Sequence, residues 1–225
     1  MFPLEEALDA RDMLTEAEFK ELYLAEPADS TDQFFHVEKF GIVEELPAGV
    51  RQARAWDLAV TPDQKGKSDP DWTVGAKLAW DGRRIFVVDI VKKRLGPDQV
   101  VDLVKRTAVA DGPACDQVIE EELGAAGKIM VAQFKKLLQD TPGAGRVFPS
   151  PVSGGKEARA FMFASRVNEG NGSLVVGGWN QEFSDECDSF PDGDHDDMVD
   201  AAAHAYNRLD PRNEAPLQAW IPGLD

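Results

Sequence analysis

Three short runs of apolar, β-branched and aromatic residues follow one another in the first half of the chain. They cover residues 53–60, 73–80 and 84–91, a length and composition typical of strands. The last two runs are separated by Asp81-Gly82, a pair that favours tight hairpin turns because glycine readily adopts a positive φ. The pattern therefore predicts three consecutive antiparallel strands.

Farther along the chain, apolar residues recur at helical spacing between short buried runs. Helices are predicted over residues 98–110, 128–139, 156–168, 180–190 and 196–209, and strands over 117–119 and 147–148, with 174–176 as a short extended piece. Three antiparallel strands followed by alternating strands and helices indicate an α/β fold. We expect a mixed sheet of about five strands, the first three antiparallel, with helices on both faces.

The first 50 residues do not share this pattern. Thr15 and Glu18 are placed as reciprocal caps of an amphipathic helix that ends before Pro27, and residues 28–50 have no clear period. We expect an N-terminal helix and connector over residues 1–50, a main domain over 51–210 and a C-terminal tail over 211–225.

The composition limits the kind of protein this can be. A length of 225 residues supports one full core, and 41 Asp and Glu against 24 Lys and Arg give a formal net charge of −17. This balance argues against a protein that coats nucleic acid by charge alone, because phosphate binding relies on Lys and Arg. No apolar run approaches the roughly 18 residues of a membrane span, and the N-terminus is acidic where a signal peptide is basic. Since the two cysteines form no zinc or disulfide pattern, we expect an intracellular protein that is not secreted.

Asp57 is the first candidate for chemistry. It lies in the nearly apolar segment ARAWDLAVT, where a buried charge costs several kcal/mol unless it is paired or bound to metal. The alternative is a strand-end acid exposed at an edge of the sheet. Position alone leaves both interpretations open.

Glu120, Glu121 and Glu122 directly follow the fourth predicted strand. Residues just beyond the carboxyl end of such a strand face the crevice where ligands bind, and because neighbours point to opposite faces only one or two of the three can reach it. The alternative is a solvated acidic loop. The segment GAAGK that follows places Lys128 at a helix start suited to a phosphate, and no Walker A motif occurs in the chain.

The segment FPDGDHDDMVDAAAHAY is the most specific of the three acidic sites. Asp196, Asp197 and Asp200 crowd the first turn of a predicted helix whose other face is apolar, and the helix dipole accounts for only one or two of these acids. Their repulsion needs a cation. Acids without a His and Cys grouping favour Mg²⁺ or Mn²⁺, and a pair of such ions roughly 4 Å apart can hydrolyse a phosphodiester. The sequence therefore predicts a nuclease, with His195 more readily a structural partner of the acids than a general acid or base.

Six segments in order resemble one known family. They are WDLAVT from residue 56, SDPDWTVGAKL from 68, IFVVDIVKKRLGPDQV from 85, VIEEELGAAGK from 118, GGKEARA from 154 and FPDGDHDDMVDA from 190. Together they are similar to the nuclease domain of the large terminase subunit of tailed bacteriophages, over about residues 51–210. The resemblance implies an RNase H-like fold and a metal-dependent endonuclease that cuts concatemeric viral DNA in the host cytoplasm when packaging starts and ends.

The resemblance also implies roles for single residues. Asp57 corresponds to the acid of the first strand that two metal ions share, and Glu120 to the acid that closes the fourth strand, with Glu122 as the alternative. Asp197 corresponds to the ligand on the last helix, with Asp196 beside it as an alternative or auxiliary ligand. We expect Asp200 to lie behind these ligands or to be an ordinary residue of the helix.

Partners follow from the same resemblance. We expect double-stranded DNA, contacted by Lys128 and Lys156, together with a terminase small subunit, a portal and an ATPase motor domain, and no membrane. Arg159 is as readily a solvated helix residue as a DNA contact. Residues 1–50 resemble the linker to the motor domain, but without a Walker A motif ATP-driven translocation is not assigned to this chain.

Two other functions are compatible with the same residues. A Holliday-junction resolvase or another RNase H-like nuclease could use the same acids. A catalytically inactive packaging module could instead dock on its partners through the acidic surface and the N-terminal helix.

Overall fold

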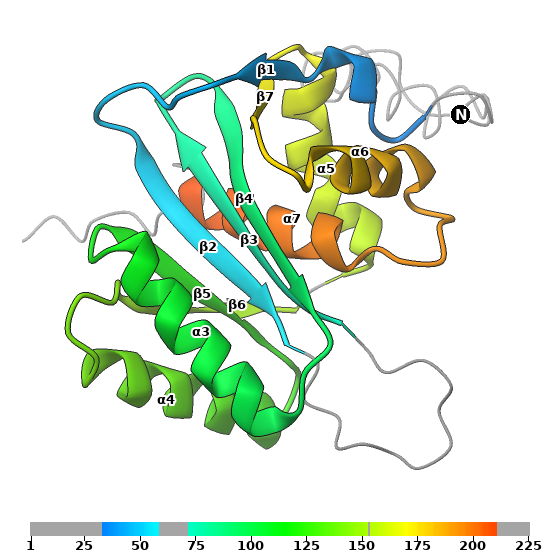
Figure 1. Ribbon diagram of the computed structural model, residues 1–225. Helices are drawn as coiled ribbons and strands as arrows, with labels where there is room; N and C mark the ends of the chain where they lie inside the picture. Colours follow the sequence, from blue (N-terminus) through cyan, green and yellow to red (C-terminus); the bar gives the residue numbers. More distant parts are fainter. Residues whose placement is uncertain (1–32, 59–71, 153, 211–225) are drawn as a thin grey trace, which may run out of the picture. The chain divides into compact units, whose positions relative to one another are not determined.

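The computed structural model describes residues 33–58, 72–152 and 154–210 of the chain, and the elements named here belong to one compact unit that begins at Phe35. Its centre is a seven-stranded sheet in the order β1-β7-β4-β3-β2-β5-β6 (Figure 1). The strands are β1 (Gly41–Val43), β2 (Arg51–Asp57), β3 (Thr73–Trp80), β4 (Ile85–Lys93), β5 (Cys115–Glu121), β6 (Val147–Pro151) and β7 (Gly172–Val175). The helices are α3 (Pro97–Asp111), α4 (Ala125–Gln139), α5 (Lys156–Asn168), α6 (Asn180–Ser189) and α7 (Asp197–Leu209), with a short 3-10 helix at Val37–Lys39.

Strands β2, β3 and β4 form the predicted antiparallel meander. The turn between β3 and β4 is built by Asp81 and Gly82. The Asp81 carboxylate accepts hydrogen bonds from the backbone N–H groups of Arg83 and Arg84 at 2.8 and 2.7 Å, and Gly82 has a φ of +100°. The side chain thus replaces backbone partners in the turn, as Asp does in tight turns.

The other strand pairs are all parallel, with β5 beside β2, β6 beside β5, β7 beside β4 and β1 beside β7. The mixed α/β sheet is therefore confirmed, with two strands more than expected. β1 lies in the stretch expected to be a connector, and β7 was expected only as an extended piece. Both have four residues or fewer, too short for a period of two to stand out.

Helices cover both faces of the sheet, as predicted (Figure 1). α3 and α4 lie on one face, where Trp56 and Ile119 pack with helix residues such as Leu103 and Phe134. α7 crosses the opposite face over β2 and β3, and α5 packs against it. Among the described helices, none has both the length and the apolar character needed to cross a bilayer.

Some expectations fall outside the described residues. These are the helix expected before Pro27, the last two residues of the first predicted strand and the tail over 211–225. The division of the chain into a lead-in, a main domain and a tail therefore stays a prediction.

A close contact fixes β2 just before its last residue. The Trp56 indole lies over Gly75 of β3, so near that a Cβ on Gly75 would be 2.6 Å from the ring. The indole Nε1 also donates a hydrogen bond to the Gln117 side-chain oxygen at 3.0 Å. Because Trp56 is held from two strands, the position of Asp57 beside it is well defined.

Candidate functional site

The parallel pairing of β2 with β5 brings two acids to the same edge of the sheet. Trp56 is paired with Ile119, so the next residues along each strand, Asp57 and Glu120, are neighbours. Parallel strands end at the same edge, where ligands of open α/β sheets bind. The register of β2 against β5 thus places the first two acidic candidates side by side. The hydrophobic pattern of the sequence does not specify this register.

A small pocket of about 120 Å³ lies at this edge. Four acids line it, together with Leu58, Gly127 and Met130; these acids are Asp57, Glu120, Glu122 and Asp200. Glu120 and Glu122 both reach it, so the choice between them stays open. Asp200, which we expected behind the ligands or as an ordinary helix residue, is itself part of the lining.

Asp57 is the acid most strongly affected by its surroundings. Burial, and then the negative charges of Glu120, Asp197, Asp200 and Asp196, raise the pKa of this carboxyl to about 8. Acids from β5 and from the start of α7 thus interact electrostatically with this one carboxyl at the end of β2. The predicted ligands therefore share one electrostatic environment, although they are far apart in the sequence.

The pKa values of the neighbouring acids shift in the same direction. Burial and then the charge of Asp200 raise the pKa of Glu120, and burial and then Asp196 raise that of Asp197. Burial also raises the pKa of Asp200, although Arg159 opposes the shift. Without a cation, the cluster is more easily protonated than ordinary carboxyls are.

Two basic side chains of α5 neutralise part of this cluster. Lys156 Nζ lies 2.8 Å from Asp196 Oδ2, so the lysine expected on the DNA forms an ion pair within the protein. Arg159 was expected to be either a solvated helix residue or a DNA contact. Its guanidinium instead donates a hydrogen bond to Asp200 Oδ2 at 2.8 Å. Asp200 Oδ1 is buried and has no hydrogen-bond partner among the described residues. Lys128 is exposed in the first turn of α4.

The first turn of α7 is capped by a residue that sequence reasoning did not identify. Glu186 of α6 is only 6% exposed, and its carboxylate accepts the backbone N–H groups of Met198 and Val199. Asp196, at the N-cap position, makes no capping hydrogen bond with its side chain. Lys92 of β4 lies 3.5 Å from Glu186. The available signal was the run of acids without Lys or Arg over 179–200, which called for cations from elsewhere.

The donor set suits a hard divalent cation. Among the described residues, the charged groups that line the acidic pocket are all carboxylates, and the Asp200 Oδ1 oxygen has no hydrogen-bond partner there. As the side chains stand, no three His, Cys, Asp or Glu residues in the described ranges are grouped closely enough to hold an ion. His195 lies with Nδ1 3.9 Å from Asp197 Oδ2. The residues therefore fit such an ion by the chemistry of their oxygens.

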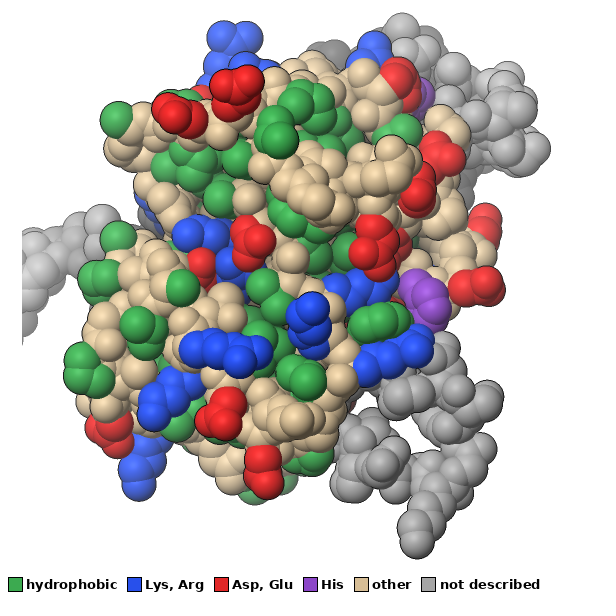
Figure 2. Space-filling model, viewed as in Figure 1, with side chains coloured by type: hydrophobic (Ala, Val, Ile, Leu, Met, Phe, Trp, Pro, Cys, Tyr) green, Lys and Arg blue, Asp and Glu red, His purple; other side chains and the backbone are tan. Residues whose placement is uncertain are grey.

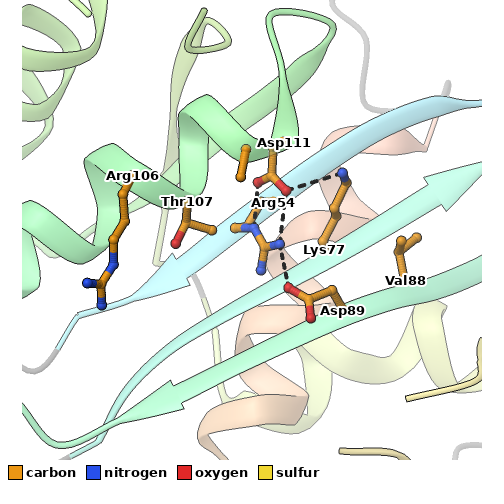
Figure 3. Close-up of a pocket in the computed structure, with 8 residues that line it drawn as sticks. Arg54, Lys77, Val88, Asp89, Arg106, Thr107 and Asp111 are labelled. Carbon is orange, nitrogen blue, oxygen red and sulfur yellow. Dashed lines mark hydrogen bonds and ion pairs between the residues drawn. The ribbon is translucent and has the colours of Figure 1, made fainter. Parts of the chain in front are cut away.

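A second polar cluster lies three residues earlier on β2. The Arg54 guanidinium, in a side chain only 2% exposed, contacts Asp111 at 2.6 Å and Asp89 at 2.7 Å (Figure 3). It also donates to the Gly75 carbonyl, while Lys77 lies 3.2 Å from Asp111. Because these charges are paired with one another beside α3, we assign the cluster a structural role.

Comparison with known protein families and with solved structures identifies terminase domains in both cases. The family described as terminase RNaseH-like domain matches residues 54–209. The human cytomegalovirus terminase nuclease domain, soaked with manganese and bound to an inhibitor, aligns with a TM-score of 0.60 and 13% identity over 81% of this chain and 96% of its own. The large terminase nuclease of thermophilic phage G20c, with bound zinc, aligns with a TM-score of 0.55 and 17% identity over 79% and 99%.

A longer protein also shares the fold. The large terminase of a thermophilic bacteriophage aligns with a TM-score of 0.59 and 11% identity over 92% of this chain and 53% of its own length. This chain therefore spans about half of that protein. No curated protein matches the sequence. At such low identities the structural likeness shows the fold alone.

Proposed function

Because the chain belongs to the family of terminase RNaseH-like domains, we propose that it is a divalent-metal-dependent endonuclease that cuts duplex DNA during phage genome packaging. The observation that carries the proposal is the pocket at the ends of β2 and β5, where Asp57, Glu120 and Asp200 meet. Mutual repulsion of this kind is relieved by a bound cation. The fold, the acids and the matching family all favour the same chemistry.

The metal ions are proposed to be Mg²⁺ or Mn²⁺. Asp57, Glu120 and Asp197 would hold them, with Asp196 beside Asp197 and with Asp200 added because it lines the pocket. Bound as a pair, such ions would activate a water and stabilise the departing 3′ oxygen. Manganese and zinc in the structures of similar nucleases support a divalent ion.

The protein's own contribution is to hold the acids in place before substrate arrives. Trp56, held against Gly75 and Gln117, fixes the end of β2. Glu186 anchors the first turn of α7, so that the acids of that turn need not cap their own helix. Such pre-organisation keeps ligands near their working geometry.

The proposed substrate is double-stranded DNA in the host cytoplasm, and the proposed partners are a terminase small subunit, a portal and an ATPase motor domain. Basic side chains gather in a band over α3 and the nearby strand ends (Figure 2), although the net charge of the chain is −17. Lys128 stays a proposed contact to the DNA backbone. For Lys156 such a contact would require release of Asp196.

Plasmid cleavage tests the proposal. The wild-type chain is incubated with supercoiled plasmid and Mn²⁺, beside Asp57→Asn and the control Asp102→Asn, which changes an exposed acid of α3. We expect nicked and linear DNA from wild type and control, and a loss of at least about 100-fold in Asp57→Asn. Equal cleavage by Asp57→Asn, or none by the wild type, would contradict the proposal.

A further inference from the structure

A separate cavity of about 720 Å³ lies between β6, α5 and α7. Its lining includes Phe148, Ser150, Arg159, His204 and Arg208. None of the described residues that line it is Asp or Glu, although the chain contains 41 of them. A surface that is free of acids in so acidic a protein favours an anionic ligand.

Two polar side chains that line the cavity each have a buried nitrogen without a hydrogen-bond partner among the described residues. His204 is 2% exposed, and its Nδ1 lies 2.7 Å from Ser150 Oγ, but its Nε2 has no hydrogen-bond partner among the described residues. Nε of Arg159 is also buried and has no hydrogen-bond partner among the described residues. Buried polar atoms normally find partners, and these two nitrogens, although themselves buried, belong to side chains that line the cavity.

Arg159 connects this cavity with the acidic pocket. Its side chain lines the cavity, while its guanidinium is bonded to Asp200, which lines the acidic pocket. The two pockets are therefore neighbours that share one ion pair. The acidic pocket carries carboxylates suited to cations, whereas the larger cavity carries basic groups suited to phosphates.

We propose that this cavity, which we call the acid-free cavity, binds the phosphodiester backbone of a nucleic-acid strand next to the bond that is cut. Arg159 would exchange Asp200 for a phosphate of that strand. The inference rests on the proposed nuclease function and extends it to the path of the substrate.

The exchange follows from the geometry of Asp200. Its Oδ2 already accepts a hydrogen bond from the Arg159 guanidinium. If this carboxylate bound a metal ion, its ion pair with Arg159 would weaken. The released guanidinium would remain on the cavity wall, where its planar donors suit a phosphate. Arg208 is already held by Asp116 and lies 3.7 Å from the Phe148 ring centroid, so the Asp116 carboxylate offsets its charge and the side chain forms a fixed part of the wall.

Ala158 allows a test that removes no existing contact. It is an exposed residue of α5 that lines the acid-free cavity. Ala158→Glu and Ala158→Lys change the charge of the wall in opposite directions. Ala132, an exposed residue of α4 on the other face of the sheet, gives the matched controls Ala132→Glu and Ala132→Lys.

The measurement is the fluorescence anisotropy of a short labelled DNA strand titrated with each protein in the presence of Ca²⁺. We expect Ala158→Glu to weaken binding by about 5-fold or more and Ala158→Lys to tighten it, with a steeper salt dependence for the lysine. Tighter binding cannot result from a failure to fold. The controls should stay within about twofold of the wild type.

Equal effects at positions 158 and 132, or no binding by the wild type, would overturn the inference. The readout does not depend on cleavage. If the position 158 variants bind DNA like the wild type while Asp57→Asn abolishes plasmid cutting, the proposed role of the cavity is wrong. The proposed nuclease function is then still supported. If Asp57→Asn cuts normally, the nuclease proposal fails whatever the anisotropy shows.

Discussion

The Glu186 carboxylate accepts the backbone N–H of Met198 at 2.6 Å, and this bond ties α6 to the first turn of α7. The same oxygen accepts the Val199 N–H at 3.0 Å. Helix caps usually come from the residue that precedes the helix. Here a neighbouring helix supplies the cap, and the side chain of Asp196 at the N-cap position makes no capping hydrogen bond.

Removal of this cap should destabilise the protein. We expect Glu186→Ala to lower the free energy of unfolding by about 1–3 kcal/mol, because two buried N–H groups lose their acceptor. Glu186→Gln retains a carbonyl oxygen for both bonds and should recover most of the loss. Urea unfolding measures both variants. An equal loss in the two would assign the effect to the ion pair with Lys92 and contradict the capping role.

Asp57 should make the stability of the metal-free protein depend on pH. Its pKa of about 8 in the folded chain exceeds the value near 3.9 of an unfolded chain. Between these values the folded chain binds a proton that the unfolded chain has released, so the free energy of unfolding falls as the pH rises from about 4 to about 8.

Asp57→Asn should remove this component. In EDTA we expect its melting temperature to match that of the wild type at pH ~4 and to exceed it by roughly 2–8 °C at pH ~8.5. Thermal unfolding across this pH range measures the difference. Parallel curves for the two proteins would contradict the raised pKa.

The Arg54 cluster should matter for stability rather than for metal. Asp111→Ala leaves a buried guanidinium without its closest partner, and we expect a loss of about 3–5 kcal/mol. Asp102→Ala, on the exposed side of the same helix, should change the stability by less than about 0.5 kcal/mol. Urea unfolding compares them. Similar stability of the two variants would show that Arg54 does not depend on Asp111.

The contact of Trp56 with Gly75 gives a fourth prediction. Gly75→Ala places a methyl group 2.6 Å from the indole, and we expect a loss of about 1–3 kcal/mol from overpacking. Gly178→Ala is the control, because a Cβ there meets nothing within 4 Å. Thermal unfolding and plasmid cutting are measured together. Loss of cutting without loss of stability would indicate that the indole positions Asp57 directly.

Sequence reasoning captured what is local. The Asp81-Gly82 turn and the helical spacing over 156–168 are encoded by neighbouring residues, and the structure forms both the hairpin and α5 there. It missed β1, whose pairing with β7 joins segments that are distant in the sequence.

The acidic site shows the same limit. The position of Glu120 near the end of a strand could be predicted from the short apolar run before it. Asp57 was placed inside a strand predicted over 53–60, whereas β2 ends at Asp57. The approach of Asp200 to these two acids could not be predicted, since it depends on which side of α7 meets the sheet. The capping role of Glu186 and the pairing of Arg159 with Asp200 were not predicted for the same reason, because their partners lie on other elements.

Calorimetric titration with Mn²⁺ tests the central claim most directly, because it measures the metal site without DNA or cleavage. The wild type and Asp102→Asn should bind Mn²⁺ at millimolar concentration or below, and Asp57→Asn should bind at least about tenfold more weakly. Absence of binding by the wild type at millimolar Mn²⁺, or unchanged binding by Asp57→Asn, would contradict the account.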